Sequence, residues 1–147
     1  MSLRERLADE MKVAMKARED LKLSTIRLVR SAVKNKEIDL KREMDDREVV
    51  ETISTLVKQR RESIRLFMEA GRDDLVSKEE KELTILLGFL PEQLSREEVG
   101  ELVARVIDEA GAQGSKDMGR VMKALSPLVA GRADGKMVSE IVKERLG

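Results

Sequence analysis

Residues 88–98 read Gly-Phe-Leu-Pro-Glu-Gln-Leu-Ser-Arg-Glu-Glu, and this stretch divides the chain into two parts. Proline disfavours helical geometry in the residue before it, so a helix is expected to end ahead of Pro91. Ser95 and Glu98 then have the spacing of a capping box, in which a hydroxyl and a carboxylate accept hydrogen bonds from backbone N–H groups at a helix start. We therefore predict two helical units, residues 1–90 and residues 91–147.

Start and stop signals of the same kind recur along the chain. Serine or aspartate stands three residues before glutamate in three further boxes: Ser2 with Glu5, Asp45 with Glu48 and Ser77 with Glu80. Glycine follows a periodic stretch at three places: Gly71, Gly111 and Gly131. These signals predict helices over about 3–19, 22–43, 46–70, 78–88, 96–110, 116–130 and 135–146. No sustained polar and apolar alternation indicates a strand. The predicted fold is all-α, with an N-terminal helical unit followed by a small C-terminal three-helix unit.

The composition excludes several kinds of chemistry. The chain has 147 residues, 29 basic and 29 acidic side chains, and no histidine, cysteine, tryptophan or tyrosine. Histidine and cysteine are needed for the usual zinc sites, thiol nucleophiles and histidine-based triads. With two phenylalanines as its aromatic residues, the chain also has almost no platform for stacking single-stranded bases. Glycine-rich phosphate loops of the common patterns are missing too. We expect no catalytic residue, no metal site and no cofactor.

The sequence carries no signal for a membrane. The longest apolar run, about residues 85–90, is far shorter than a membrane span. The first residues contain no apolar segment of the secretory type, and the absence of cysteine fits a reducing compartment. We therefore expect a cytoplasmic protein with no membrane partner.

Basic side chains form rows beside the apolar faces of three predicted helices. At about 100° per residue, a row of four cations lies beside the apolar stripe of the second helix: Arg27, Arg30, Lys34 and Lys41. The third helix carries a similar row: Lys58, Arg61 and Arg65. The sixth helix carries Lys116, Arg120 and Lys123 opposite its apolar face. Such rows are either solvated surfaces or contacts for a polyanion, since lysine and arginine dominate affinity for nucleic acid.

The turn before the last helix adds two cations. Arg132 and Lys136 would stand near a helix N-terminus that could hold a phosphate, but Asp134 could instead cap that helix and occupy the same N–H groups. A helix-turn-helix comparison is weaker, because Glu140 and Glu144 would face DNA.

Arg60 interrupts the apolar stripe of the third helix. An unpaired charge is costly to bury, so we expect a buried stem and a carboxylate partner, with Glu37 as a candidate. The alternative is a role in binding a ligand.

Five segments together resemble the YqeY family. They are residues 27–38 (RLVRSAVKNKEI), 58–64 (KQRRESI), 90–95 (LPEQLS), 116–119 (KDMG) and 131–136 (GRADGK). The resemblance covers essentially the whole chain. This family is similar in turn to the C-terminal helical tail of GatB, a subunit of the glutamine-dependent aminoacyl-tRNA amidotransferase. The positions most like that tail are Met118, Gly119, Met122, Gly131, Asp134, Gly135 and Lys136.

The resemblance implies an all-helical module whose partner is tRNA or another structured RNA. It also implies a family label of carbon–nitrogen ligase activity with glutamine as amido donor, although the catalytic domain of GatB has no counterpart in this chain. We expect an accessory RNA-binding module that uses Lys116, Arg120, Lys123, Arg132, Lys136, Arg27, Arg30 and Lys34. Two other functions stay open. One is a protein–protein adaptor, and the other is a participant in amidotransferase chemistry with partner subunits.

Overall fold

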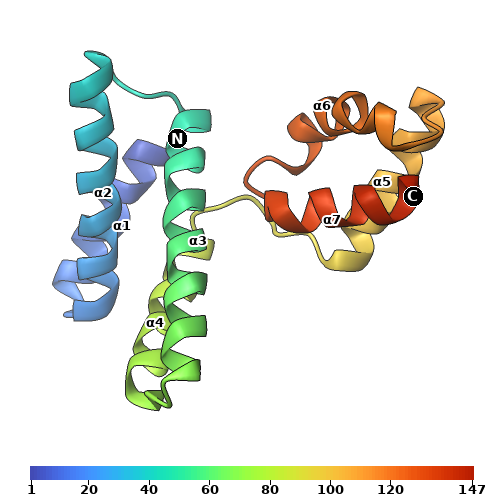
Figure 1. The fold of residues 1–147 in the computed structure, drawn as a ribbon. Helices are drawn as coiled ribbons and strands as arrows, with labels where there is room; N and C mark the ends of the chain where they lie inside the picture. The colour runs from blue at the N-terminus through green and yellow to red at the C-terminus, as the bar shows by residue number, and fades with distance from the viewer. The chain divides into compact units, whose positions relative to one another are not determined.

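A computed structural model describes residues 1–147 as an all-α protein without strands. Its α-helices are α1 (Leu3–Lys16), α2 (Asp20–Leu40), α3 (Asp46–Glu69), α4 (Asp73–Leu87), α5 (Arg96–Ala110), α6 (Met118–Val129) and α7 (Gly135–Leu146). A 3-10 turn, η1 (Ser115–Asp117), leads into α6. Contacts divide the chain into two compact units, Met1–Leu90 and Pro91–Gly147 (Figure 1). The predicted all-α class is confirmed.

The helix starts at α3 and α5 follow directly from side-chain chemistry. The Asp45 side chain accepts a hydrogen bond from the Glu48 N–H, and the Glu48 carboxylate accepts one from the Asp45 N–H. Ser95 and Glu98 make the same reciprocal pair at α5. These bonds satisfy backbone donors that the first turn of a helix leaves without partners.

The predicted start at Ser77 is wrong. Helix α4 begins at Asp73, directly after the left-handed Gly71 and the N-cap residue Arg72, so Ser77 lies inside the helix. Asp73 and Asp74 in the first turn favour this earlier start, because negative charge stabilises a helix N-terminus.

Two predicted helix ends are also wrong, for a shared reason. Helix α1 ends at Lys16 rather than near residue 19, and α2 ends at Leu40 rather than near residue 43. The backbone turns at Arg18 (φ 56°) and Lys41 (φ 59°), which adopt the left-handed conformation without glycine. No glycine marks either turn in the sequence.

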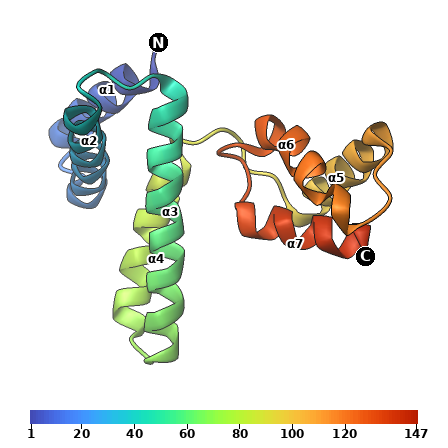
Figure 2. The same cartoon turned by 45° about the horizontal axis from the view of Figure 1, so that its top comes forward.

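The N-terminal unit consists of two helical hairpins. Helix α1 packs on α2, and α3 packs on α4, with α2 contacting both members of the second hairpin (Figure 2). Apolar side chains at helical spacing form its core: Leu7, Ile26, Val29, Val33, Val49, Ile53, Leu86 and Phe89 are all buried. This packing fixes the faces that α1 and α2 present to each other.

Arg60 supports the packing of α3 on α4. Its Nε lies 3.1 Å from Glu79 Oε2 and 2.9 Å from Glu82 Oε2, and all three side chains are mostly buried. The Arg60 N–H does not aim at either oxygen within hydrogen-bond geometry, so the attraction is that of an ion pair. The expectation of a carboxylate partner is met, but Glu37 is not that partner. Helix α4, rather than α2, lies against this face of α3.

The C-terminal unit is a three-helix cluster. Helices α5, α6 and α7 contact one another around buried aliphatic residues: Val99, Val103, Val121, Leu125, Val138, Ile141 and Val142. The segment that enters this unit is tied to the turn between α6 and α7, because Gln93 Nε2 donates to the Gly131 carbonyl at 2.7 Å. The Leu94 N–H likewise donates to the Arg132 carbonyl at 2.8 Å.

Candidate functional site

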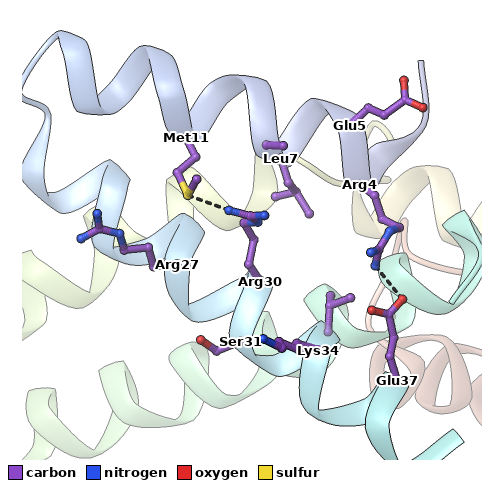
Figure 3. A pocket seen from close by; sticks show the side chains of 11 residues that line it. Arg4, Glu5, Leu7, Met11, Arg27, Arg30, Ser31, Lys34 and Glu37 are labelled. Atoms are coloured by element: carbon purple, nitrogen blue, oxygen red, sulfur yellow. Dashed lines mark hydrogen bonds and ion pairs between the residues drawn. The ribbon is translucent and has the colours of Figure 1, made fainter. Parts of the chain in front are cut away.

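The structure brings one predicted row of cations into a groove. Between α1 and α2 lies a cavity of about 840 Å³, here called the α1–α2 groove. Its apolar lining residues are Leu7, Ala8, Met11 and Val33, and its basic ones are Arg4, Arg27, Arg30 and Lys34 (Figure 3). The sequence predicted three of these four cations as a row on one helix. The groove adds Arg4 from the other helix.

One acidic residue of the groove already has its charge matched. Arg4 Nη1 donates to Glu37 Oε2 at 2.6 Å, and the Met44 N–H donates to the same oxygen at 2.7 Å. The Met44 N–H, with a further contribution from the Arg4 guanidinium, lowers the pKa of Glu37, which therefore stays ionised at neutral pH. Arg4 and Glu37 neutralise each other at one end of the groove.

The other cations of the groove have no carboxylate partner. Arg30 Nη1 donates to the Met11 sulfur at 3.0 Å, a weak acceptor, and Figure 3 shows this side chain reaching across to α1. Arg27 and Lys34 are exposed and make no hydrogen bond or ion pair. Three adjacent positive charges on α2 are therefore free to bind an external anion.

The second predicted row lies on η1 and α6. Lys116, Arg120 and Lys123, here called the α6 basic row, are exposed, while Val121 and Leu125 on the same helix are buried. Arg120 Nη2 lies 3.3 Å from Asp117 Oδ1, an ion pair at the helix start. Lys116 and Lys123 have no carboxylate partner.

Asp117 anchors the start of this row. The Gln113 N–H donates to Asp117 Oδ2 at 3.0 Å, and this bond, with Arg120, lowers the pKa of the Asp117 carboxyl. The carboxylate is therefore charged at neutral pH and offsets part of the positive charge of Arg120.

The turn before α7 is capped rather than open. Asp134 Oδ1 accepts a hydrogen bond from the Lys136 N–H at 3.1 Å, so the capping interpretation holds and the carboxylate occupies the place proposed for a phosphate. Arg132 is partly buried and its Nε donates to the Glu92 carbonyl at 3.1 Å. The Lys136 side chain is exposed.

Other surfaces contribute less. On α3, Arg65 pairs with Glu62 and Glu69, so the third basic row loses part of its charge to neighbouring carboxylates. A second cavity of about 410 Å³ in the C-terminal unit is lined by residues such as Asp108 and Arg145, and by none of the predicted cations. No group of three or more acidic, histidine or cysteine side chains is placed to hold a metal ion. None of the helices combines the length and apolarity that crossing a membrane requires.

Sequence reasoning missed the contribution of α1. Arg4, Ala8 and Met11 recur at helical spacing and face the groove together, but their row contains a single cation. Only the packing of α1 against α2 reveals that this row and the basic row of α2 share one cavity.

Comparison with known proteins gives a consistent family match. The profile of the family described as "Yqey-like protein" matches residues 4–146. A Kluyveromyces lactis protein named "Altered inheritance of mitochondria protein 41, mitochondrial" is 39% identical over 107 residues, which are 70% of this chain and 57% of that protein. The protein of the same name from Eremothecium gossypii is 42% identical over 85 residues, which are 57% of this chain and 46% of the relative. The chain thus spans about half the length of the curated relatives it matches.

The relatives' names correct one prediction. These proteins are named as mitochondrial, which contradicts the cytoplasmic localisation expected from the sequence. The expectation rested on the absence of cysteine and of an apolar leader. Neither observation bears on mitochondrial targeting, whose signals are amphipathic and arginine-rich rather than apolar.

Proposed function

The chain belongs to the YqeY-like protein family, and from that membership we propose that it acts as an accessory module that binds tRNA or another structured RNA. The proposal concerns binding alone. Chemistry on an aminoacyl-tRNA would fall to other proteins, because this chain has no histidine or cysteine and no glycine-rich phosphate loop.

The observation that carries the proposal is the α6 basic row. Lys116, Arg120 and Lys123 are all exposed on the side of α6 opposite its buried residues, and two of the three have no internal partner. Lysine and arginine in such a row can contact successive phosphates of an RNA backbone. The partly buried Arg132 lies in the turn that follows this helix, and the exposed Lys136 lies in the first turn of α7; both extend the proposed surface.

The proposed mode of binding is recognition of shape and charge. The protein lacks tyrosine and tryptophan for stacking on bases, so the proposed contacts are to the phosphate backbone. With about three phosphates neutralised, the logarithm of the binding constant should fall with the logarithm of salt concentration at a slope of roughly −2 to −3. Folded tRNA should compete better than an unstructured oligonucleotide of equal charge.

The test is a salt titration of tRNA binding by fluorescence anisotropy. The variant Arg120→Glu with Lys123→Glu should flatten the slope by about one to two units, because two of the phosphate contacts are lost. The matched control, Arg105→Glu with Lys143→Glu, changes the net charge equally at exposed positions of the same unit and should keep the parental slope.

Two outcomes would contradict this assignment. Unchanged tRNA affinity in the first variant, with its helix content intact, would place the RNA surface outside the α6 basic row. Absence of tRNA binding by the parent protein at low salt would reject RNA as the partner.

A further inference from the structure

The wall of the α1–α2 groove formed by α1 is charged at its start, where Arg4 and Glu5 lie, and apolar beyond them. Ala8 and Met11 line the groove, and Met15 follows them on the same face of α1 at helical spacing. Met15 is a large apolar side chain that is 48% exposed to solvent. Methionine is flexible and polarisable, and it suits surfaces that adapt to a partner helix.

The opposite wall, formed by α2, is basic and ends in another apolar residue. Arg27, Arg30 and Lys34 follow one another along this wall without carboxylate partners. Ile38 shares the face of Arg27 and Lys34 one turn further on, and it is 63% exposed. The groove therefore combines an apolar side and a cationic side, and beyond its lining each helix carries one more exposed apolar residue on the same face, Met15 on α1 and Ile38 on α2.

We propose that the α1–α2 groove binds an acidic amphipathic helix of a protein partner. In that complex, apolar side chains of the partner pack against Ala8, Met11 and Met15, while carboxylates along one flank meet Arg27, Arg30 and Lys34. Helix-in-groove recognition uses this combination of an apolar ridge and charged flanks. This binding is distinct from the RNA binding proposed for α6.

The apolar residues of the α1 wall favour a protein over RNA as the ligand of the groove. An RNA backbone would satisfy the three cations but would leave the exposed Met15 without an apolar partner, and methionine offers no aromatic face to a base. An acidic amphipathic helix satisfies both walls at once. Glu37 does not oppose the carboxylates of such a helix, because Arg4 and the Met44 N–H hold it. The remaining acid of the groove, Glu5, lies on α1 beside Arg4, on the wall opposite the three cations.

The helix rise gives the expected size of the partner segment. From Arg4 to Met15 the α1 wall runs for about 16 Å, so a bound helix of about three turns covers it. The three cations of α2 extend over about 10 Å, which matches carboxylates placed on two successive turns of the partner.

The experiment uses a synthetic helical peptide of about four turns as the probe. The peptide carries leucine at helical spacing and glutamate along one flank, and a scrambled peptide of identical composition is its control. With methyl-labelled methionine in the intact protein, we expect the signals of Met11 and Met15 to shift on saturation. Those of Met68 and Met118 should stay in place. The scrambled peptide should produce no saturable shift.

Matched variants separate the cationic wall from net charge. Arg27→Glu with Lys34→Glu should weaken peptide binding about tenfold. The control, Lys36→Glu with Lys81→Glu, makes the same charge change at exposed positions away from the groove and should bind as the parent does. Met15→Gln should weaken binding about threefold, whereas Met68→Gln on α3 should leave it unchanged.

Three results would overturn the proposal. One is equal binding of the ordered and scrambled peptides, which would indicate attraction by charge alone. Another is a shift of Met11 and Met15 by tRNA at low salt, with displacement of the peptide, which would make the groove an RNA surface. The third is sedimentation of the free protein as a dimer that Arg27→Glu with Lys34→Glu dissociates, which would assign the groove to a second copy of the chain.

Discussion

Replacing Arg60 by alanine should destabilise the N-terminal unit far more than replacing its neighbour Arg61. The Arg60 side chain is only 21% exposed and stands between the carboxylates of Glu79 and Glu82, which are 18% and 12% exposed. Arg61 is exposed and has no ion pair. The two variants therefore remove the same charge from adjacent positions of α3 and differ in what they leave behind.

The magnitude follows from the two carboxylates that Arg60→Ala leaves uncompensated. Breaking a fully buried pair costs about 3–5 kcal/mol, and an exposed pair contributes about 1 kcal/mol or less. Because this cluster is mostly but not fully buried, we expect about 2–3 kcal/mol. In a unit of this size each kcal/mol lowers Tm by roughly 4–8 °C, so Tm should fall by about 10–20 °C. Arg61→Ala should stay within about 0.5 kcal/mol of the parent.

The assay is urea and thermal unfolding followed by circular dichroism, since the protein has no tryptophan or tyrosine for fluorescence. A further variant tests the cause. Adding Glu82→Gln to Arg60→Ala removes one of the stranded charges and should restore part of the lost stability, whereas a simple loss of arginine packing would not be relieved. The reasoning is refuted if Arg60→Ala unfolds with the same midpoint as Arg61→Ala.

Three further predictions concern pH, catalysis and domain structure. Hydrogen bonds from Arg42 and from the Asp45 N–H lower the pKa of Glu48 from 4.5 to about 2. The ionised carboxylate therefore stabilises the fold above pH 4.5, and this stabilisation is lost as the pH falls towards 2. In acid unfolding, Glu48→Gln should lose less stability than the parent protein over that range. The isolated protein should not convert Glu-tRNA or Asp-tRNA to the amide with glutamine and ATP, and product above the no-enzyme rate in a preparation free of host amidotransferase would contradict this. Limited proteolysis should cut first within residues 88–95, and mass spectrometry of the earliest fragments would locate the cut. If that segment stayed intact, the division into two independent units would be rejected.

Local chemistry could be predicted from the sequence wherever one residue determines it. Asp45 and Ser95 cap helices because their side chains reach the N–H groups three residues further along the chain, a contact that residues close in sequence make by themselves. Ser77 and Glu80 have the same spacing but lie within α4. A capping box acts only where a helix begins, and α4 begins four residues earlier, at Asp73. Arg18 and Lys41 show the converse case. Both adopt a left-handed turn that no glycine announces.

Contacts between distant segments could not be predicted in this way. A buried Arg60 needs a carboxylate partner, and the sequence contains 29 aspartate and glutamate residues that could provide it. The packing of α3 on α4 places Glu79 and Glu82 beside Arg60, and the sequence alone does not indicate that packing. The α1–α2 groove is a similar case. Its basic wall can be recognised from the spacing of residues on one helix. Its apolar wall can be recognised only from the structure, in which α1 lies beside α2.

A net charge of zero does not argue against binding an anion, because ion pairs remove charge unevenly from this surface. Arginines such as Arg42 and Arg65 are matched by carboxylates on their own or neighbouring turns. Arg27, Arg30 and Lys34 keep their charge within about 10 Å of one another. At physiological salt the screening length is about 8 Å, so a ligand in the groove responds mainly to the charges that line it, which include these three cations and Glu5, and much less to acidic residues elsewhere. The unpaired charges close to a surface, rather than the sum over the chain, therefore determine what that surface attracts.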